Sequence, residues 1–266
     1  MKKLLYIILA CSVSFAACEK GTLVETTEYE KVALGDPKYS YLKILNVTPG
    51  SPFINYYVDG AKFSSALSSS GVENSGYNYA TATSLYPDFG YATTAPGARK
   101  LTAKTIPSLT IDANLEVLNT TITPVAGKYY TLFTSGVYSA TNKSVGPILM
   151  IEDIRPALDT AKIFLRFVNM YSGSPNLDLV KTSTMSKIAT NVAYGAASKF
   201  AEIPMPGNGI APVNALALYD SLTGVALTSS ANFTFTKGRA YTIYIRGVLG
   251  NTTYPLTTGS YTTFQY

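Results

Sequence analysis

Residues 42–46 read Leu-Lys-Ile-Leu-Asn and are followed at residues 50–52 by Gly-Ser-Pro. Nearly the same order returns 123 positions later, as Leu-Arg-Phe-Val-Asn at residues 165–169 and Gly-Ser-Pro at residues 173–175. Self-similarity at a fixed distance is the signature of a repeated structural unit. The sequence therefore predicts two successive copies of one domain.

A second pair of matching segments lies near the end of each copy. Residues 127–133 (Gly-Lys-Tyr-Tyr-Thr-Leu-Phe) match residues 238–244 (Gly-Arg-Ala-Tyr-Thr-Ile-Tyr) at a shorter distance of 111 positions. The first copy therefore contains a net 12 additional residues, which we place after its second expected strand, in a stretch that includes residues 71–79. Insertions in β domains fall in loops, where binding surfaces are often built.

Four tyrosines lie in or just after this insertion, and we take them as candidate binding residues. A tyrosine ring offers a flat apolar face with a hydroxyl at its tip, which suits stacking on a sugar ring or a partner protein. The alternative is that the rings line edge strands and pack on the core, as in many β-rich sequences. The candidates are Tyr77, Tyr79, Tyr86 and Tyr91.

Short runs of alternating apolar and hydroxyl-bearing residues recur along the whole chain. Residues 129–133 and 241–245 are examples, and Gly, Pro and Asn punctuate the intervals between such runs. This pattern is typical of strands, and no window keeps the spacing of an amphipathic helix for long. The sequence predicts an all-β protein with two sandwich domains, at residues 40–153 and 154–266.

The N-terminus has the order of an export signal. Lys2 and Lys3 precede an apolar run, and small residues lead to Cys18. The run is too short for a membrane span, which needs about 20 apolar residues. We expect residues 1–17 to be a signal peptide and Cys18 to carry a lipid. Cys11 is the competing acceptor, but processing there would leave a very short hydrophobic segment.

The segment after the lipidation site is expected to be an extended stalk. Residues 18–39 mix Glu, Thr and Lys with few apolar residues, which is the composition of a flexible linker. The expected partner is thus a membrane, and the expected location is the bacterial cell envelope, at the outer membrane, with the periplasmic or surface face left open. The 21 basic residues are dispersed against 16 acidic ones, so no nucleic-acid partner is expected.

The residues needed for catalysis are nearly missing from the sequence. The chain has no histidine, which excludes Ser-His-Asp and Cys-His catalysis and leaves no Cys and His zinc site. Phosphate-binding and calcium-loop motifs are also missing, so neither a metal nor a cofactor is expected. A glycosidase needs two converging carboxylates, and its candidates would be Glu152, Asp153, Asp159 and Asp178. Adjacent strand residues point to opposite faces, so Glu152 and Asp153 cannot easily converge, and we expect no enzyme.

Two tripeptides resemble acceptors for O-glycosylation of exported bacterial proteins. They are residues 159–161 (Asp-Thr-Ala) and 220–222 (Asp-Ser-Leu), with Thr160 and Ser221 as the acceptors. The alternative is that these residues only stabilise turns at strand ends through side-chain hydrogen bonds.

The order of these motifs resembles the family of domains of unknown function numbered 4397. The resemblance rests on the apolar strand ending in Asn, the Gly-Ser-Pro turn, the strand that ends at residues 56–60 (Tyr-Tyr-Val-Asp-Gly) and the acidic junction at residues 152–153. It implies secreted or surface-attached bacterial proteins, often lipoproteins, built from immunoglobulin-like β-sandwich copies, and it implies no catalytic residues. In the first copy Asn55 replaces Asp178 of the second, so this carboxylate is not a requirement of both copies.

Together these features favour a lipid-anchored envelope protein that acts as a non-catalytic binding or adhesion module for a glycan or a surface protein. A purely structural envelope component is the alternative. A carboxylate-dependent glycoside hydrolase is a distant third.

Overall fold

Every regular element that the structure describes is a β-strand. The computed structural model describes residues 31–65, 71–79, 84–205, 210–228 and 231–265, and residues Gly35–Tyr266 form one compact unit. The described residues contain no helix long and apolar enough to cross a membrane. The prediction of an all-β protein is confirmed.

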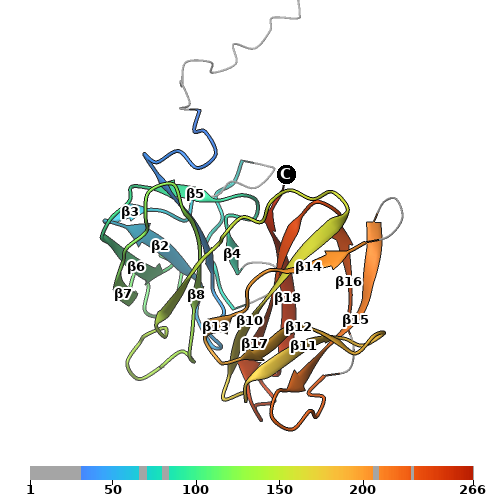
Figure 1. Ribbon diagram of the computed structural model, residues 1–266. Coiled ribbons are helices and arrows are strands. Elements are labelled where there is room, and N and C mark those ends of the chain that lie inside the picture. The colour runs from blue at the N-terminus through green and yellow to red at the C-terminus, as the bar shows by residue number, and fades with distance from the viewer. Residues whose placement is uncertain (1–30, 66–70, 80–83, 206–209, 229–230, 266) are drawn as a thin grey trace, which may run out of the picture. The chain divides into compact units, whose positions relative to one another are not determined.

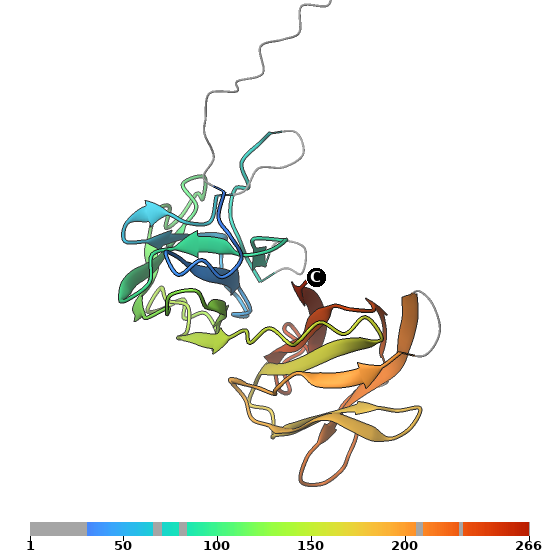
Figure 2. The same ribbon diagram turned by 45° about the horizontal axis from the view of Figure 1, so that its top comes forward.

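The strands form two groups, which follow one another along the chain and are separate in Figures 1 and 2. The first sandwich consists of β1 (Ser40–Leu45), β2 (Ile54–Val58), β3 (Ala61–Lys62), β4 (Leu85–Tyr86), β5 (Ala92–Thr94), β6 (Arg99–Thr105), β7 (Glu116–Ile122), β8 (Tyr129–Thr134) and β9 (Ile148–Glu152). The second consists of β10 (Lys162–Ser172), β11 (Leu177–Lys181), β12 (Ser186–Val192), β13 (Ala196–Ala197), β14 (Ala201–Pro204), β15 (Ile210–Asp220), β16 (Ala231–Thr236), β17 (Ala240–Val248) and β18 (Thr257–Phe264).

Both sandwiches have the same topology. In the first, one sheet has the order β4-β1-β8-β9 with β5 also pairing to β1, and the other has the order β3-β2-β6-β7. In the second, the corresponding orders are β13-β10-β17-β18, with β14 on β10, and β12-β11-β15-β16. The first strand of each sandwich pairs in parallel with the eighth, β1 with β8 and β10 with β17. The repeat in the sequence thus corresponds to a repeat of topology.

Alternation along the strands builds a separate core in each sandwich. In β1, Leu42 and Ile44 point into the first core, and in β10, Leu165 and Phe167 point into the second. Both cores consist of fully buried aliphatic and aromatic side chains, and burial of each such side chain contributes about 1.5–3 kcal/mol. Each sandwich therefore has its own hydrophobic core.

The asparagine of the repeated motif is buried and ties three segments together. The side-chain amide of Asn46 donates to Ser51 Oγ (2.9 Å) and to the carbonyl of Tyr77 (3.2 Å). That of Asn169 donates to Ser174 Oγ (3.0 Å) and to the carbonyl of Val192 (3.1 Å). The motif recurs because a buried amide must have its hydrogen bonds satisfied, and the Gly-Ser-Pro serine supplies one partner.

The outward faces of the β1 and β10 sheets are buried as well. Leu45 and Phe133 of the first sandwich form one apolar cluster with Val168 and Tyr244 of the second. We call this contact region between the two sandwiches the seam. It explains why residues 42–46 and 165–169 are apolar at most positions: each strand is covered on both faces.

Polar side chains are buried in the same seam. Arg166 Nη2 lies 2.6 Å from Asp153 Oδ1, and both side chains are almost completely buried. Asp153 Oδ2 accepts hydrogen bonds from Thr131 Oγ1 (2.6 Å) and Tyr91 OH (2.8 Å). Burial alone would lower the pKa of Arg166, but the ion pair with Asp153 raises it. A buried ion pair of this kind requires such supporting hydrogen bonds.

The end of the predicted stalk contacts the first sandwich. The backbone N–H of Gly35 donates to the hydroxyl of Tyr129 (2.9 Å), and Tyr39 accepts a backbone hydrogen bond from Gly127 (2.7 Å). Residues 35–39 therefore belong to the compact unit. The predicted signal peptide and Cys18 lie outside the described residues.

Candidate functional site

Two of the four candidate tyrosines, Tyr77 and Tyr86, pack in the first core, as the alternative interpretation expects. Tyr77 is 2% exposed and Tyr86 is 7% exposed. Their rings pack edge to face with centroids 5.5 Å apart. Tyr77 forms a bridge with Ile54, the same pairing that Val192 makes with Leu177 in the second sandwich. Tyr77 thus takes the place of an ordinary core residue, and the additional residues lie on both sides of it: 8 of the net 12 precede it and 4 follow.

The other two candidate tyrosines lie at the seam. The guanidinium of Arg246 lies over the ring of Tyr79, 4.4 Å from the ring centroid, and donates a hydrogen bond to the backbone carbonyl of Tyr79. The ring of Tyr254 packs edge to face against the ring of Tyr79, with centroids 5.7 Å apart. Tyr91 donates to Asp153 and stacks on Phe264 at 5.9 Å. The tyrosines of the insertion region therefore stabilise the fold and the seam and do not form an exposed aromatic surface.

The candidate carboxylates do not converge. Glu152 is solvent-exposed and pairs with Lys128 (2.9 Å), while the adjacent Asp153 points into the seam, so the two point to opposite faces as predicted. Asp159 pairs with Lys162 (3.1 Å). Asp178 is buried in the second sandwich. Within the described residues no group of three or more His, Cys, Asp and Glu is placed to hold a metal ion.

The two candidate glycosylation acceptors have different environments. Thr160 is exposed, in the segment between the sandwiches. Ser221 is partly buried, and its hydroxyl donates a short hydrogen bond to Asp178 Oδ1 (2.5 Å). The Ser221 hydroxyl therefore has a structural partner, as expected for a residue that stabilises a turn.

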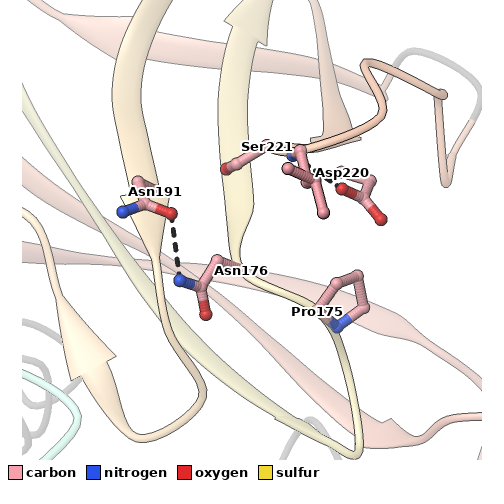
Figure 3. A pocket seen from close by; sticks show the side chains of 6 residues that line it. Pro175, Asn176, Asn191, Asp220 and Ser221 are labelled. Atoms are coloured by element: carbon pink, nitrogen blue, oxygen red, sulfur yellow. Dashed lines mark hydrogen bonds between the residues drawn. The ribbon is translucent and has the colours of Figure 1, made fainter.

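Ser221 also lines a pocket of about 340 Å³ at one end of the second sandwich (Figure 3). The pocket lies where the Gly-Ser-Pro turn meets the end of β12 and the loop after β15. Leu222 at its edge is 94% exposed. A volume of this size falls at the lower end of the range for small-molecule sites. The lining residues are Pro175, Asn176, Asn191, Asp220, Ser221 and Leu222.

The pocket presents polar atoms that the protein does not use. Figure 3 shows Asn176 Nδ2 donating to Asn191 Oδ1 (2.9 Å), and Asp220 Oδ1 accepts from the backbone N–H groups of Leu222 (2.8 Å) and Thr223 (3.0 Å). Within the part of the chain that the structure describes, the remaining groups have no hydrogen bond. They are Asn176 Oδ1, Asn191 Nδ2 and Asp220 Oδ2.

Asp178 connects two residues that line this pocket, Asn191 and Ser221. Burial would raise the pKa of Asp178, but hydrogen bonds from Lys187, Ser221 and the backbone N–H of Asn191 outweigh it and lower the pKa. The Lys187 Nζ to Asp178 Oδ2 distance is 2.6 Å and the Asn191 N–H donates at 2.8 Å. The ionised carboxylate therefore holds the β12 and β15 sides of the pocket together.

A bulge in β12 directs Asn191 into the pocket. The β11–β12 register shifts between the Leu177–Val192 and Leu179–Ala189 pairs, and Asn191 has a left-handed backbone (φ 53°). Asparagine tolerates this conformation better than most residues, and bulges commonly reorient a side chain next to a functional site.

The first sandwich is closed at the corresponding place. The backbone N–H of Ile106 donates to the carbonyl of Phe53, just as that of Ser221 donates to the carbonyl of Asn176. Ile106 is buried, and a Cβ on Gly76 would lie 2.5 Å from its Cγ2. The same pairing places Gly76 at the position of Asn191. Three polar pocket residues of the second sandwich thus correspond to Phe53, Gly76 and Ile106.

Sequence reasoning did not find this pocket as a site. It identified Ser221 and Asp178 for other reasons, and Asn176 and Asn191 are ordinary turn residues by type. The only sequence signal was the contrast between the copies: Asn176 stands where the first copy has Phe53, at the same offset of 123 positions.

The family described as a domain of unknown function (DUF4397) matches residues 40–180. The chain belongs to this family. The predicted family is thus confirmed. The matched segment covers the first sandwich and continues through β10 into β11. No curated protein matches the sequence.

Several solved structures align with most of the chain at low similarity. A family 26 carbohydrate-binding module from Eubacterium rectale Amy13K, solved with maltoheptaose, is 11% identical, with 85% of this chain and 98% of that chain covered and a TM-score of 0.23. A proposed cell adhesion protein from Bacteroides uniformis is 10% identical, with 85% and 100% covered and a TM-score of 0.22. One from Bacteroides fragilis is also 10% identical, with 85% and 99% covered and a TM-score of 0.18. TM-scores this low carry no information on the function of this chain.

Proposed function

We propose that this protein is a non-catalytic binding module of the bacterial cell envelope, anchored by a lipid on Cys18, and that it binds its ligand at the end of the second sandwich. One observation carries the proposal: this end is an open pocket with polar side chains in its lining, whereas at the same end of the first sandwich the buried side chain of Ile106 fills the space above Gly76. A pocket lined by apolar surface and a few polar groups is the usual form of a ligand site.

The test converts the second sandwich into the first at this place. The soluble chain of residues 19–266 is measured for saturable binding to a panel of polysaccharides and extracellular-matrix proteins. The triple variant Asn176→Phe, Asn191→Gly and Ser221→Ile is then compared with it. We expect a panel member to bind the parent chain and to lose at least tenfold in affinity with the variant, since the exchange fills the pocket. Unchanged binding by a variant of unchanged melting temperature would reject the pocket.

The anchor is tested separately by metabolic labelling with palmitate. We expect Cys18→Ala to lose the label and Cys11→Ala to retain it. The hydrophobic segment before Cys18 is longer than the one before Cys11 and has the length expected of a signal peptide. The opposite pattern would move the anchor to Cys11. The outer-membrane location is tested by fractionation of the labelled protein.

A structural role is the second candidate, and the seam favours it. A buried ion pair and an apolar cluster join the two sandwiches, as suits a protein that braces an assembly. If no panel member binds and deletion of the protein weakens the cell envelope, the structural role is preferred.

A further inference from the structure

We infer that the pocket of the second sandwich takes an uncharged saccharide, bound through its hydroxyl groups. This inference rests on the proposed function and names its ligand class. Three unused polar atoms carry the inference: the amide oxygen of Asn176, the amide nitrogen of Asn191 and the second carboxylate oxygen of Asp220.

These three atoms form a mixed set of one donor and two acceptors. A sugar hydroxyl both donates and accepts, so the hydroxyls of a saccharide can satisfy acceptors and donors alike. The hydrogen bond from Asn176 to Asn191 fixes both amides in orientation, which leaves less side-chain entropy to lose on binding. Pro175 and Leu222 add apolar surface against which the C–H face of a sugar ring can pack.

The charges of the pocket argue against an anionic ligand. Asp220 lines the pocket, and the ionised Asp178 accepts hydrogen bonds from Ser221 and Asn191 of its lining. Lys187 is the cation beside them, and its ammonium pairs with Asp178. A uronic acid or sulfated sugar would therefore meet a carboxylate at Asp220 with no opposing cation lining the pocket. Like charges at short range disfavour such a complex.

The experiment uses the soluble chain of residues 19–266 and an immobilised panel with three arms. The first arm holds neutral oligosaccharides of glucose, galactose, mannose and N-acetylglucosamine, the second holds matched uronic-acid and sulfated oligosaccharides, and the third holds extracellular-matrix proteins. We expect binding in the neutral arm with a Kd on the order of 1 mM for a short oligosaccharide, as is usual for so small a contact, and much weaker binding in the acidic arm.

Two variants test the proposed contacts. Asp220→Asn keeps an oxygen for the N–H groups of Leu222 and Thr223 but replaces the free acceptor by a donor. Asn191→Gly removes the amide and suits the left-handed backbone. Each should weaken neutral-sugar binding about tenfold, the loss of one charge-assisted or well-oriented hydrogen bond. The control is Asp112→Asn. This partly exposed carboxylate lies in the corresponding loop of the first sandwich and pairs with Lys143, and the variant should bind like the parent.

Each outcome either supports the inference or overturns it. Neutral-sugar binding that falls in both pocket variants and not in the control supports the inference. Acidic sugars that bind as tightly as neutral ones or more tightly overturn it. Neutral-sugar binding that is unchanged in Asp220→Asn and Asn191→Gly also overturns it. Binding to a matrix protein alone overturns the inference of a saccharide ligand but agrees with the proposed function as a binding module. No binding in any arm overturns both.

Discussion

At the end of the first sandwich the buried side chain of Ile106 fills the space above Gly76, whereas at the same end of the second sandwich Ser221 and Asn191 line an open pocket. The strand pairing around both places is equivalent: the strands pair in the same order, and equivalent N–H groups donate to equivalent carbonyls. The scaffold therefore does not require either filling. In a tandem repeat, one copy can serve stability while its counterpart keeps the same position for a ligand.

The seam contains a second contrast between equivalent positions. Arg166 lies 123 positions after Lys43, and both are buried on the outward faces of equivalent strands. Arg166 forms an ion pair with Asp153, while the ammonium of Lys43 donates to the carbonyl of Pro87 (3.2 Å) and sits over the rings of Tyr91 and Tyr261. One cation is compensated by a charge and the other by dipoles and aromatic faces.

The largest effect on stability is expected from removing Asp153, the carboxylate that pairs with Arg166 in the seam. Asp153→Ala leaves the buried guanidinium of Arg166 without its carboxylate, which typically costs about 3–5 kcal/mol in the free energy of unfolding. Chemical denaturation of the variant measures this loss. Asp159→Ala, which removes a carboxylate at the surface, should cost far less. Equal losses would mean that the seam ion pair does not stabilise the protein.

The next largest loss of stability is expected at two equivalent core positions, Tyr77 and Val192. Tyr77→Ala should destabilise the protein by about 3–5 kcal/mol, because it removes a buried aromatic ring from the first core. Val192→Ala removes a smaller side chain from the second core, and about 2 kcal/mol is expected. Thermal melts of both variants give the comparison, with the 82% exposed Phe89→Ala as a control that should change little. A Tyr77→Ala melt like that of Phe89→Ala would place the ring outside the core.

The sequence predicted the features that repeat and failed on those that depend on how loops converge. The offset between matching segments revealed the two copies, and the recurrent Asn with its Gly-Ser-Pro turn is the buried hydrogen-bonded junction of each. The offset could not show where the additional residues enter. Tyr77 is the partner of Ile54, and only the backbone pairing reveals that it is a core position with additional residues on both sides.

The pocket and the seam lay beyond sequence reasoning for different physical reasons. The pocket depends on a bulge in β12 that turns Asn191, and no residue type encodes such a register shift by itself. The seam had a signal: Lys43 and Arg166 interrupt runs that are apolar on both faces, which indicates strands without a solvent face. The identity of the covering surface required the fold.

A smaller and equal effect is expected for the two asparagines of the motif. Asn46→Ala and Asn169→Ala each remove a buried amide and leave the carbonyls of Tyr77 and Val192 without that donor. An unsatisfied buried group costs about 1–3 kcal/mol, so the two variants should lose similar stability. Denaturant unfolding of each variant tests this. A large loss for one and none for the other would show that the motif supports only one copy.

The smallest effect concerns Lys43 and its dependence on pH. Burial lowers the pKa of Lys43 to about 8, despite the attraction of Asp153 and Asp88. The unfolded chain, in which the pKa is about 10.4, therefore binds more protons than the folded chain between pH 8 and 10. Stability must rise with pH in this window, and a protonated Lys43 costs stability below it.

Lys43→Met isolates this contribution because it fills similar volume without a charge. At pH 7 the variant should be more stable than the parent by about 1–2 kcal/mol, and the difference should shrink between pH 8 and 9.5 as the parent loses its proton. The range stops at pH 9.5 because burial raises the pKa of Tyr91 and Tyr261, whose ionisation in the unfolded chain lowers stability at higher pH. If the two proteins keep a constant difference from pH 7 to 9.5, Lys43 does not titrate in this range. The Pro87 carbonyl and the rings of Tyr91 and Tyr261 would then stabilise the charged ammonium of Lys43 as well as Asp153 stabilises the guanidinium of Arg166.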